Sequence, residues 1–284
     1  MIRNAPVIVD AHVHLWNPER FRYAWLENLP VLNRPMLPEN LIAASASAGI
    51  SKFIFVECGC DPSQSLQEVD WITDLARAKP QLKGIIAHAS LERGEAVLAD
   101  LEFLATRPLV KGVRRNLQGE NNDFFKQPAF VAGLKLLPRF GFTFDLCIRH
   151  DQLSAAGELV RSVPQVTFVL DHFGKPLVRS KSLEPWASHL RTLAGAPNVA
   201  CKISGLATEA DWTDWRQTDL KPYFDHALTC FGLHRVIFGS DWPVATLATS
   251  YDRWIETVLE LIPIASERKQ TQLFQTNAER IYRV

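Results

Sequence analysis

The chain has 284 residues, of which 47% are hydrophobic, a composition that suits a large folded core and excludes a disordered chain. Lys plus Arg and Asp plus Glu both total 31, so the net charge is zero and no basic run is present to bind nucleic acid or anionic lipid. No stretch approaches the roughly 18 apolar residues of a membrane-spanning helix, so we expect no membrane partner.

Two further features suggest where the protein works. Five cysteines, an odd number scattered along the chain, argue against a disulfide framework and for a reducing compartment. Asp10 and His12 interrupt the first apolar run, which a secretory signal would not allow. We expect a cytoplasmic protein that is a monomer or a homodimer.

Apolar runs recur along the chain, and most are continuous, as in strands covered on both faces. The stretches between them have helical spacing; Val97, Leu101 and Leu104, for example, share one face. The eight runs are 7–15, 52–58, 82–89, 109–116, 143–148, 166–172, 199–204 and 236–240. Three glycines precede new strands, as C-terminal glycines of helices do: Gly49, Gly141 and Gly232.

Strand followed by helix, repeated eight times, predicts an α/β fold of the (β/α)8 TIM-barrel type with its helices outside. A doubly wound open sheet is the alternative. The loop 17–40 and a final helix at 267–282 are additions to the repeat. No linker interrupts the pattern, so we expect one domain over residues 1–284. No Gly-rich phosphate loop follows the first strand, which disfavours nucleotide binding.

The first strand ends in the sequence Asp-Ala-His-Val-His, at residues 10–14. Side chains alternate along a strand, so His12 and His14 project to the same side, ~6.6 Å apart along the chain. Two imidazoles placed in this way can share a metal, a water or a carbonyl oxygen. The alternative is that they are ordinary solvated or core histidines.

Every other run also ends in ionisable or hydroxyl groups, where TIM barrels carry their reacting groups. This regularity predicts an enzyme. The groups are Glu57, His88, Arg114, Arg115, Asn116, Arg149, His150, Asp171, His172, Lys175, Lys202, Ser204, Ser240 and Asp241.

Each of these groups has a structural alternative. Asp241 is either a helix cap or a general base that takes a proton from water. His172 either orients Asp171 or joins the histidine pair in polarising a substrate oxygen or holding a metal. Glu57 is a supporting partner or an exposed strand end, and His150 contacts substrate or makes a structural hydrogen bond.

Other residues are candidates for substrate binding. Arg114 and Arg115 alternate faces, so one of them can point inward and bind a carboxylate or hydroxyls. Tyr23 and Trp25 either pack against sugar C–H faces or anchor the long loop, and Trp242 lies beside Asp241. The spacing does not determine which arginine faces the pocket.

An ordered set of motifs resembles the amidohydrolase superfamily, and more narrowly its sugar-lactone hydrolase branch. The motifs extend over nearly the whole chain: Asp10–Trp16, Tyr23–Leu26, Lys111–Arg114, Asp171–Pro176, Phe238–Pro243 and Asn277–Tyr282.

The resemblance implies a barrel hydrolase of carbohydrate metabolism that opens an L-fucono-, L-rhamnono- or galactono-lactone by Asp-activated attack of water. It assigns His12, His14, His172 and Asp241 to the reactive centre. From their places at strand ends and in the first loop, we expect a second group to bind substrate: Arg114, Trp25, His150, Tyr23, Trp242 and Glu57. Arg114 stands near the place of the carbamylated lysine of two-metal members and cannot be carbamylated. We therefore expect no strictly required cofactor, with room for a single zinc on the four reactive-centre residues.

Three rival functions remain open. A zinc-dependent decarboxylase of an unsaturated carboxylic acid would need tight metal and a carboxylate-binding arginine. A pyrone-dicarboxylate lactonase would need several inward-facing arginines. A sugar-binding protein with an inactive site would have no use for the intact histidine pair and Asp241.

Overall fold

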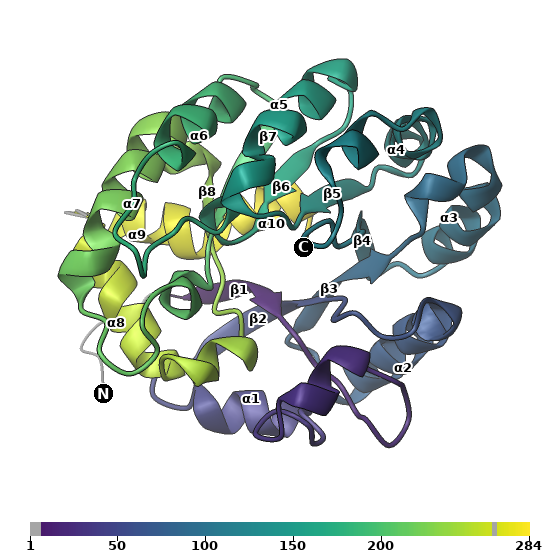
Figure 1. Cartoon of the computed structure of the whole chain (residues 1–284). Coiled ribbons are helices and arrows are strands. Elements are labelled where there is room, and N and C mark those ends of the chain that lie inside the picture. Colours follow the sequence, from purple (N-terminus) through teal and green to yellow (C-terminus); the bar gives the residue numbers. More distant parts are fainter. Residues whose placement is uncertain (1–6, 263–265) are drawn as a thin grey trace.

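The computed structural model describes residues 7–262 and 266–284. Eight parallel strands form one sheet in the order of the sequence, with helices outside it (Figure 1). The strands are β1 (Ile8–Val13), β2 (Ile50–Val56), β3 (Leu82–His88), β4 (Val110–Arg114), β5 (Thr143–Leu146), β6 (Phe168–Leu170), β7 (Val199–Ile203) and β8 (Val236–Phe238). The helices are α1 (Pro38–Ala44), α2 (Ser65–Ala78), α3 (Leu98–Ala105), α4 (Pro128–Phe140), α5 (Leu153–Ser162), α6 (Trp186–Ala194), α7 (Gln217–Phe231), α8 (Tyr251–Leu261), α9 (Glu267–Thr271) and α10 (Asn277–Tyr282).

The ring closes where the first strand meets the segment after the last one. Val13 forms a parallel bridge with Trp242, and the Asp241 N–H donates to the His12 carbonyl at 2.9 Å. The predicted TIM barrel is therefore confirmed, and the open-sheet alternative is wrong. The closure also brings the paired histidines of β1 next to Asp241.

The barrel interior has a small apolar cluster of its own. Val9, Ile54, Ile86 and Val169 belong to it, and they come from strands on opposite sides of the ring. Tyr282 of α10 is fully buried in the same cluster, so the C-terminal helix closes one end of the barrel. The other end, where the strands finish, is left for polar side chains.

Each strand ends one or two residues before the end of the apolar run that predicts it. β6 stops at Leu170 and β8 at Phe238, whereas the apolar runs continue to residues 172 and 240. The backbone turns left-handed soon afterwards, with φ of 51° at His172 and 61° at Asp241. These turns direct both side chains toward the axis of the barrel.

None of the helices within the described ranges is long and apolar enough to cross a membrane.

Candidate active site

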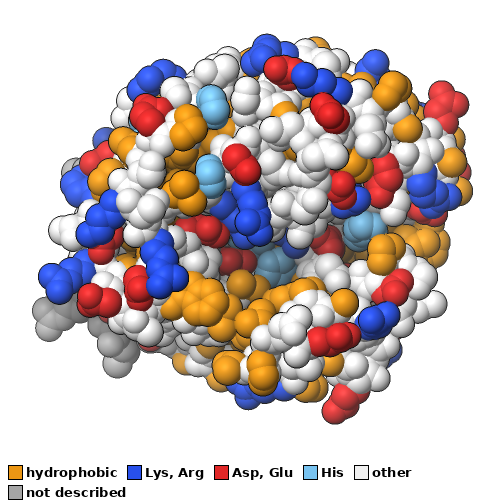
Figure 2. Space-filling view, in the orientation of Figure 1, with side chains coloured by type: hydrophobic (Ala, Val, Ile, Leu, Met, Phe, Trp, Pro, Cys, Tyr) orange, Lys and Arg blue, Asp and Glu red, His pale blue; other side chains and the backbone are white. Residues whose placement is uncertain are grey.

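A cavity of about 470 Å³ opens at the carboxyl ends of the strands. His14, His172 and Asp241 line its floor, and Trp25 lines a wall. In Figure 2 the centre of this face is hollowed, with histidine and acidic side chains visible at the bottom. The cavity is large enough for a small cyclic ligand.

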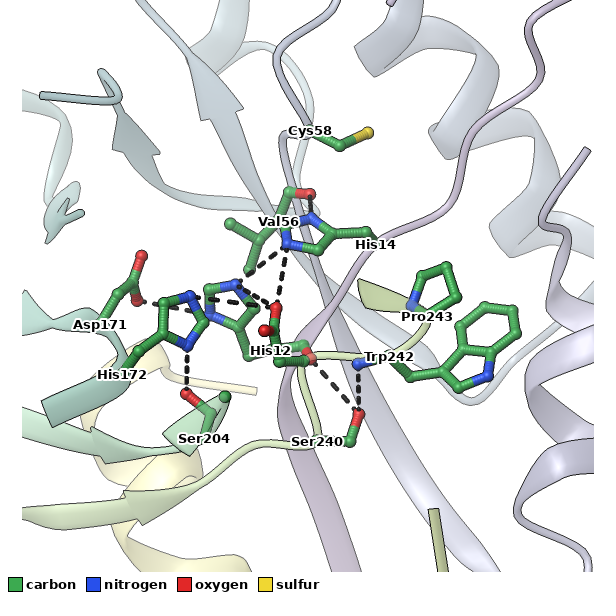
Figure 3. A network of polar contacts seen from close by, with 12 residues as sticks. His12, His14, Val56, Cys58, Asp171, His172, Ser204, Ser240, Trp242 and Pro243 are labelled. Carbon is green, nitrogen blue, oxygen red and sulfur yellow. Dashed lines mark hydrogen bonds and ion pairs between the residues drawn. The ribbon is translucent and has the colours of Figure 1, made fainter. Parts of the chain in front are cut away.

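Three imidazoles converge on one carboxylate. The Nε2 atoms of His12, His14 and His172 lie 3.7, 3.5 and 3.9 Å from Asp241 Oδ1. The Nε2 atoms of His12 and His14 are 3.2 Å apart, and Figure 3 shows the three rings turned toward one another. The Asp241 carboxylate thus faces the imidazoles and does not cap a helix.

The Nδ1 atoms of His14 and His172, on the side of each ring away from Asp241, each have a hydrogen-bond partner. His14 Nδ1 is 2.8 Å from the Val56 carbonyl, which can only accept, so in the neutral ring Nδ1 carries the hydrogen and Nε2 has the lone pair. His172 Nδ1 is 2.9 Å from Ser204 Oγ. Figure 3 shows both contacts. Partners behind each ring fix its orientation toward Asp241.

His12 has two charged partners at Nδ1. Lys202 Nζ lies at 3.1 Å and Asp171 Oδ1 at 3.3 Å. Lys202 can only donate, so next to it the neutral ring carries its hydrogen on Nε2, facing Asp241. Asp171 can accept a hydrogen from Nδ1, which would free Nε2 as a lone pair.

A layer of buried charge supports these rings. Lys202 is fully buried on β7 and pairs with Asp145 and, at 3.1 Å, with Asp171. Tyr282 donates to Asp145 at 2.9 Å, which connects α10 to the underside of the site. Sequence reasoning assigned no function to Lys202 and missed Asp145 and Tyr282. The available signal was a charged residue inside each of two apolar strands.

The ionisation of the central pair is set by its surroundings. Burial raises the pKa of Asp241, but His172, His14 and His12 favour the carboxylate more strongly and hold the pKa well below its usual range. Burial lowers the pKa of His172 to about 4, although the Asp241 charge opposes this. At neutral pH the carboxylate is therefore charged and His172 is neutral.

The segment after β6 has an unusual backbone. His172, Phe173, Gly174 and Lys175 all have positive φ, between 49° and 70°. Non-glycine residues in this region cost roughly 1–3 kcal/mol each, and such strain is concentrated at functional sites. This backbone places both His172 and Lys175 at the cavity.

Arg114, the last residue of β4, and Arg115, which follows it, point in opposite directions, as the alternation of side chains along a strand requires. Arg114 lines the cavity, but its guanidinium is already paired, with Nε 2.7 Å from Glu57 Oε1 and Nη1 3.2 Å from Asp171 Oδ2. Arg115 points away and pairs with Glu92. Arg114 therefore has little unpaired charge to offer an anion.

Four residues expected at the substrate do not line this cavity. The Tyr23 hydroxyl turns away and donates to Glu68 at 2.8 Å. Glu57 is used by Arg114 and by the Gly59 N–H, and lines a neighbouring cavity of about 250 Å³.

The other two are Trp242 and His150. The Trp242 side chain is 4% exposed and points away from the imidazoles in Figure 3. His150 begins a short helical turn after β5, outside the cavity lining. Sequence reasoning instead missed Gln118 and Cys147 as lining residues and left Asn116 and Lys175 unassigned. Side-chain direction after a strand depends on the loop conformation, which residue spacing does not reveal.

The donor set suits a divalent metal. The ligand atoms of His12, His14 and Asp241 lie within 4.8 Å of one another, and those of His12, Asp171 and His172 form a second such group. Two or three imidazole nitrogens with one carboxylate are ordinary zinc ligands. The Nδ1 partners already described, Val56 and Asp171, are of the kind that supports metal-bound histidines.

Comparisons with known proteins agree with this geometry. The model of the amidohydrolase family matches residues 9–284. An L-fucono-1,5-lactonase of Burkholderia multivorans is 31% identical over 295 residues, covering 96% of this chain and 95% of the relative. An L-fucono-1,5-lactonase of Burkholderia ambifaria is 30% identical, covering 87% and 85%. The crystal structure of a Burkholderia multivorans amidohydrolase with bound zinc superposes with a TM-score of 0.87 at 29% identity, covering 98% of this chain and 99% of that one. The motifs, the barrel and the family match agree, and this chain belongs to the amidohydrolase family.

Proposed function

We propose that this protein hydrolyses a sugar lactone to the corresponding sugar acid, with Asp241 as the general base. The observation that carries the proposal is the convergence of three imidazole Nε2 atoms on the Asp241 carboxylate, 3.5–3.9 Å away, at the floor of a cavity. The names of the two lactonase relatives, both at about 30% identity, support the substrate class.

The residues can carry out the reaction as follows. Water attacks the lactone carbonyl carbon while the ionised Asp241 takes one of its protons. The carbonyl oxygen becomes an oxyanion, which His12 and His172 can stabilise through their Nε2 hydrogens. When the bond between the carbonyl carbon and the ring oxygen breaks, Asp241 returns the proton to that oxygen. The product is an open hydroxy acid.

A metal can assist this chemistry, and a histidine Nε2 that bound it would offer a lone pair to the ion and no longer donate to the oxyanion. When bound, a divalent ion held by His12, His14, His172 and Asp241 would supply positive charge that polarises the carbonyl. His14 suits this role best, because its Nε2 keeps a lone pair and cannot donate a hydrogen bond.

Substrate orientation falls to the cavity walls. Trp25 offers an aromatic face for the C–H side of a sugar ring. Asn116 and Gln118 offer amides for ring hydroxyls, and Lys175 offers an ammonium beside the site. A monosaccharide lactone fits this mixture of one flat apolar wall and several neutral polar groups.

The charge of the cavity argues against the rival functions. A decarboxylase or a pyrone-dicarboxylate lactonase must bind one or two substrate carboxylates, and Arg114 is already neutralised by Glu57 and Asp171. A single half-buried lysine, Lys175, is the other cation at the cavity lining of the described chain. A neutral lactone needs no further cation.

The test is a pH-indicator screen of L-fucono-, L-rhamnono- and galactono-lactones, run with and without a chelator. Acid release on at least one of them, retained after chelation, is the expected result. Release of CO2 from an unsaturated acid, with no acid release from any lactone, would contradict the proposal.

A further inference from the structure

Glu68, in the first turn of α2, is a buried carboxylate outside the catalytic cluster. It is 1% exposed, and within residues 7–262 and 266–284 its polar partners are the Tyr23 hydroxyl and the Cys58 and Cys60 thiols, with no basic side chain among them. Its Oε1 accepts a hydrogen bond from the Tyr23 hydroxyl at 2.8 Å, and the Cys58 thiol lies 3.6 Å away. A buried acid without a cation is costly, so its presence here calls for a structural explanation.

The Tyr23 bond is one of several that fasten the loop after β1 to the segment around α2. The Arg22 N–H donates to Gln64 Oε1 at 2.8 Å, and the Asp61 N–H donates to the Arg22 carbonyl at 2.8 Å. The contact between Arg22 and Gln64 is exposed, whereas the bond from Tyr23 to Glu68 is buried. The buried bond is therefore the one that water competes for least.

Trp25, two residues after Tyr23, forms the wall of the cavity. Its indole N–H donates to the Cys58 carbonyl at 2.7 Å. Its ring packs edge-on against the ring of Trp16, with the two ring centroids 5.3 Å apart. A Cβ on Gly59 would lie 3.6 Å from the indole, so the ring also packs on that backbone. The position of Trp25 thus depends on how the loop is seated against residues 58–68.

We propose that Tyr23 and Glu68 are a positioning pair that seats Trp25 as the apolar wall of the substrate cavity and so determines how well a lactone ring fits. The kinetic part of this inference rests on the proposed function, whereas the structural part does not.

The hydrogen bond between Tyr23 and Glu68 does not depend on the ionisation state of Glu68. Burial raises the pKa of Glu68 to about 7, and the Glu57 carboxylate adds to the rise. Burial likewise raises the pKa of the Tyr23 phenol, so the phenol keeps its hydrogen. A carboxyl group accepts through an oxygen whether or not it is protonated, so the bond survives the titration of Glu68.

The variants separate the hydrogen bond from the bulk of the side chains. Tyr23→Phe removes the donor, and Glu68→Met removes the acceptor at nearly constant volume. Glu68→Gln keeps an accepting oxygen and serves as the conservative rescue. Tyr223→Phe is the matched control, because this buried tyrosine of α7 bonds Leu177 and Ser182, remote from Trp25.

The first measurement is hydrogen–deuterium exchange of peptides covering residues 17–29, with no substrate present. Exchange in this segment should rise about three- to tenfold in Tyr23→Phe and Glu68→Met, the factor that one hydrogen bond of ordinary net strength is worth. Glu68→Gln and Tyr223→Phe should match the wild type. Unchanged exchange in both of the first two variants overturns the pairing.

The second measurement is steady-state kinetics on whichever aldonolactone the wild type hydrolyses. The same two variants should raise KM about three- to tenfold and leave kcat within twofold, because the wall binds the ring and takes no part in proton transfer. An unchanged KM together with raised exchange overturns the link to substrate fit. If the wild type opens no lactone, the proposed function fails, and the exchange result still decides whether Tyr23 and Glu68 seat the loop.

Discussion

Gly205 lies directly against the imidazole of His172. A Cβ at Gly205 would stand 2.6 Å from His172 Nδ1 and 2.8 Å from Asp241 Oδ2, closer than any real Cβ contact. The glycine also has φ of +60°, which other residues adopt only with strain. This close approach allows the end of β7 to support both reactive groups.

Gly205→Ala should therefore damage the site more than the fold. The added methyl must displace His172 or Asp241, and a misplacement of about 1 Å costs about 10²-fold in turnover. The left-handed backbone adds roughly 1–2 kcal/mol of destabilisation. Lactone hydrolysis and urea unfolding measure the two effects.

Gly157→Ala is the control for that substitution. A Cβ at Gly157, in α5, meets only Arg161 Nη1 at 3.5 Å, so this variant should keep full activity and gain about 0.5–1 kcal/mol. Equal activity in both glycine variants would contradict the packing argument.

Lys202 should be a large contributor to stability. Lys202→Met leaves Asp145 without its cation and Asp171 with Arg114 as its remaining cation, and removing one partner of a buried ion pair costs about 3–5 kcal/mol. Adding Asp145→Asn should recover part of the loss, because the Tyr282 hydroxyl can still donate to the amide oxygen. Urea unfolding of the single and double variants checks this, and a loss below about 1 kcal/mol in Lys202→Met would refute it.

Glu68 should make stability depend on pH in a predictable direction. Its carboxyl has a pKa of about 7 when folded, compared with an ordinary value of 4.5 in the unfolded chain, so unfolding releases a proton between these values. The free energy of unfolding of the wild type should consequently fall, relative to Glu68→Gln, by up to about 3 kcal/mol as the pH rises from 4.5 to 7. Below 4.5 and above 7 the difference should be constant. A flat difference across the whole range would show that Glu68 titrates normally.

Much of this architecture is readable from the sequence. Eight apolar runs alternating with helical spacing predict the barrel, and barrel closure brings His12 and His14 to Asp241 without further information. The sequence also predicts the final helix at 267–282, where the structure has α9, a π-helical turn and α10. These features follow from the spacing of apolar residues along the chain, which the sequence alone shows.

Other parts of the site depend on packing between distant segments. Nothing in the sequence near Tyr23 indicates that its hydroxyl meets Glu68, 45 residues later, and not the substrate. The same holds for Tyr282, which reaches Asp145 through the interior of the barrel. Gly205 is an ordinary loop glycine in the sequence, and its importance emerges only when His172 and Asp241 are placed against it.

The central claim is that Asp241 activates the attacking water, and turnover by Asp241→Asn tests it most directly. Asn has the same shape and cannot accept the proton, so kcat on the best aldonolactone should fall about 10²- to 10⁴-fold while thermal unfolding stays cooperative. Asp225→Asn, an exposed aspartate paired with Lys221 on α7, should keep wild-type kcat. Turnover by Asp241→Asn within a few-fold of the wild type would contradict the account.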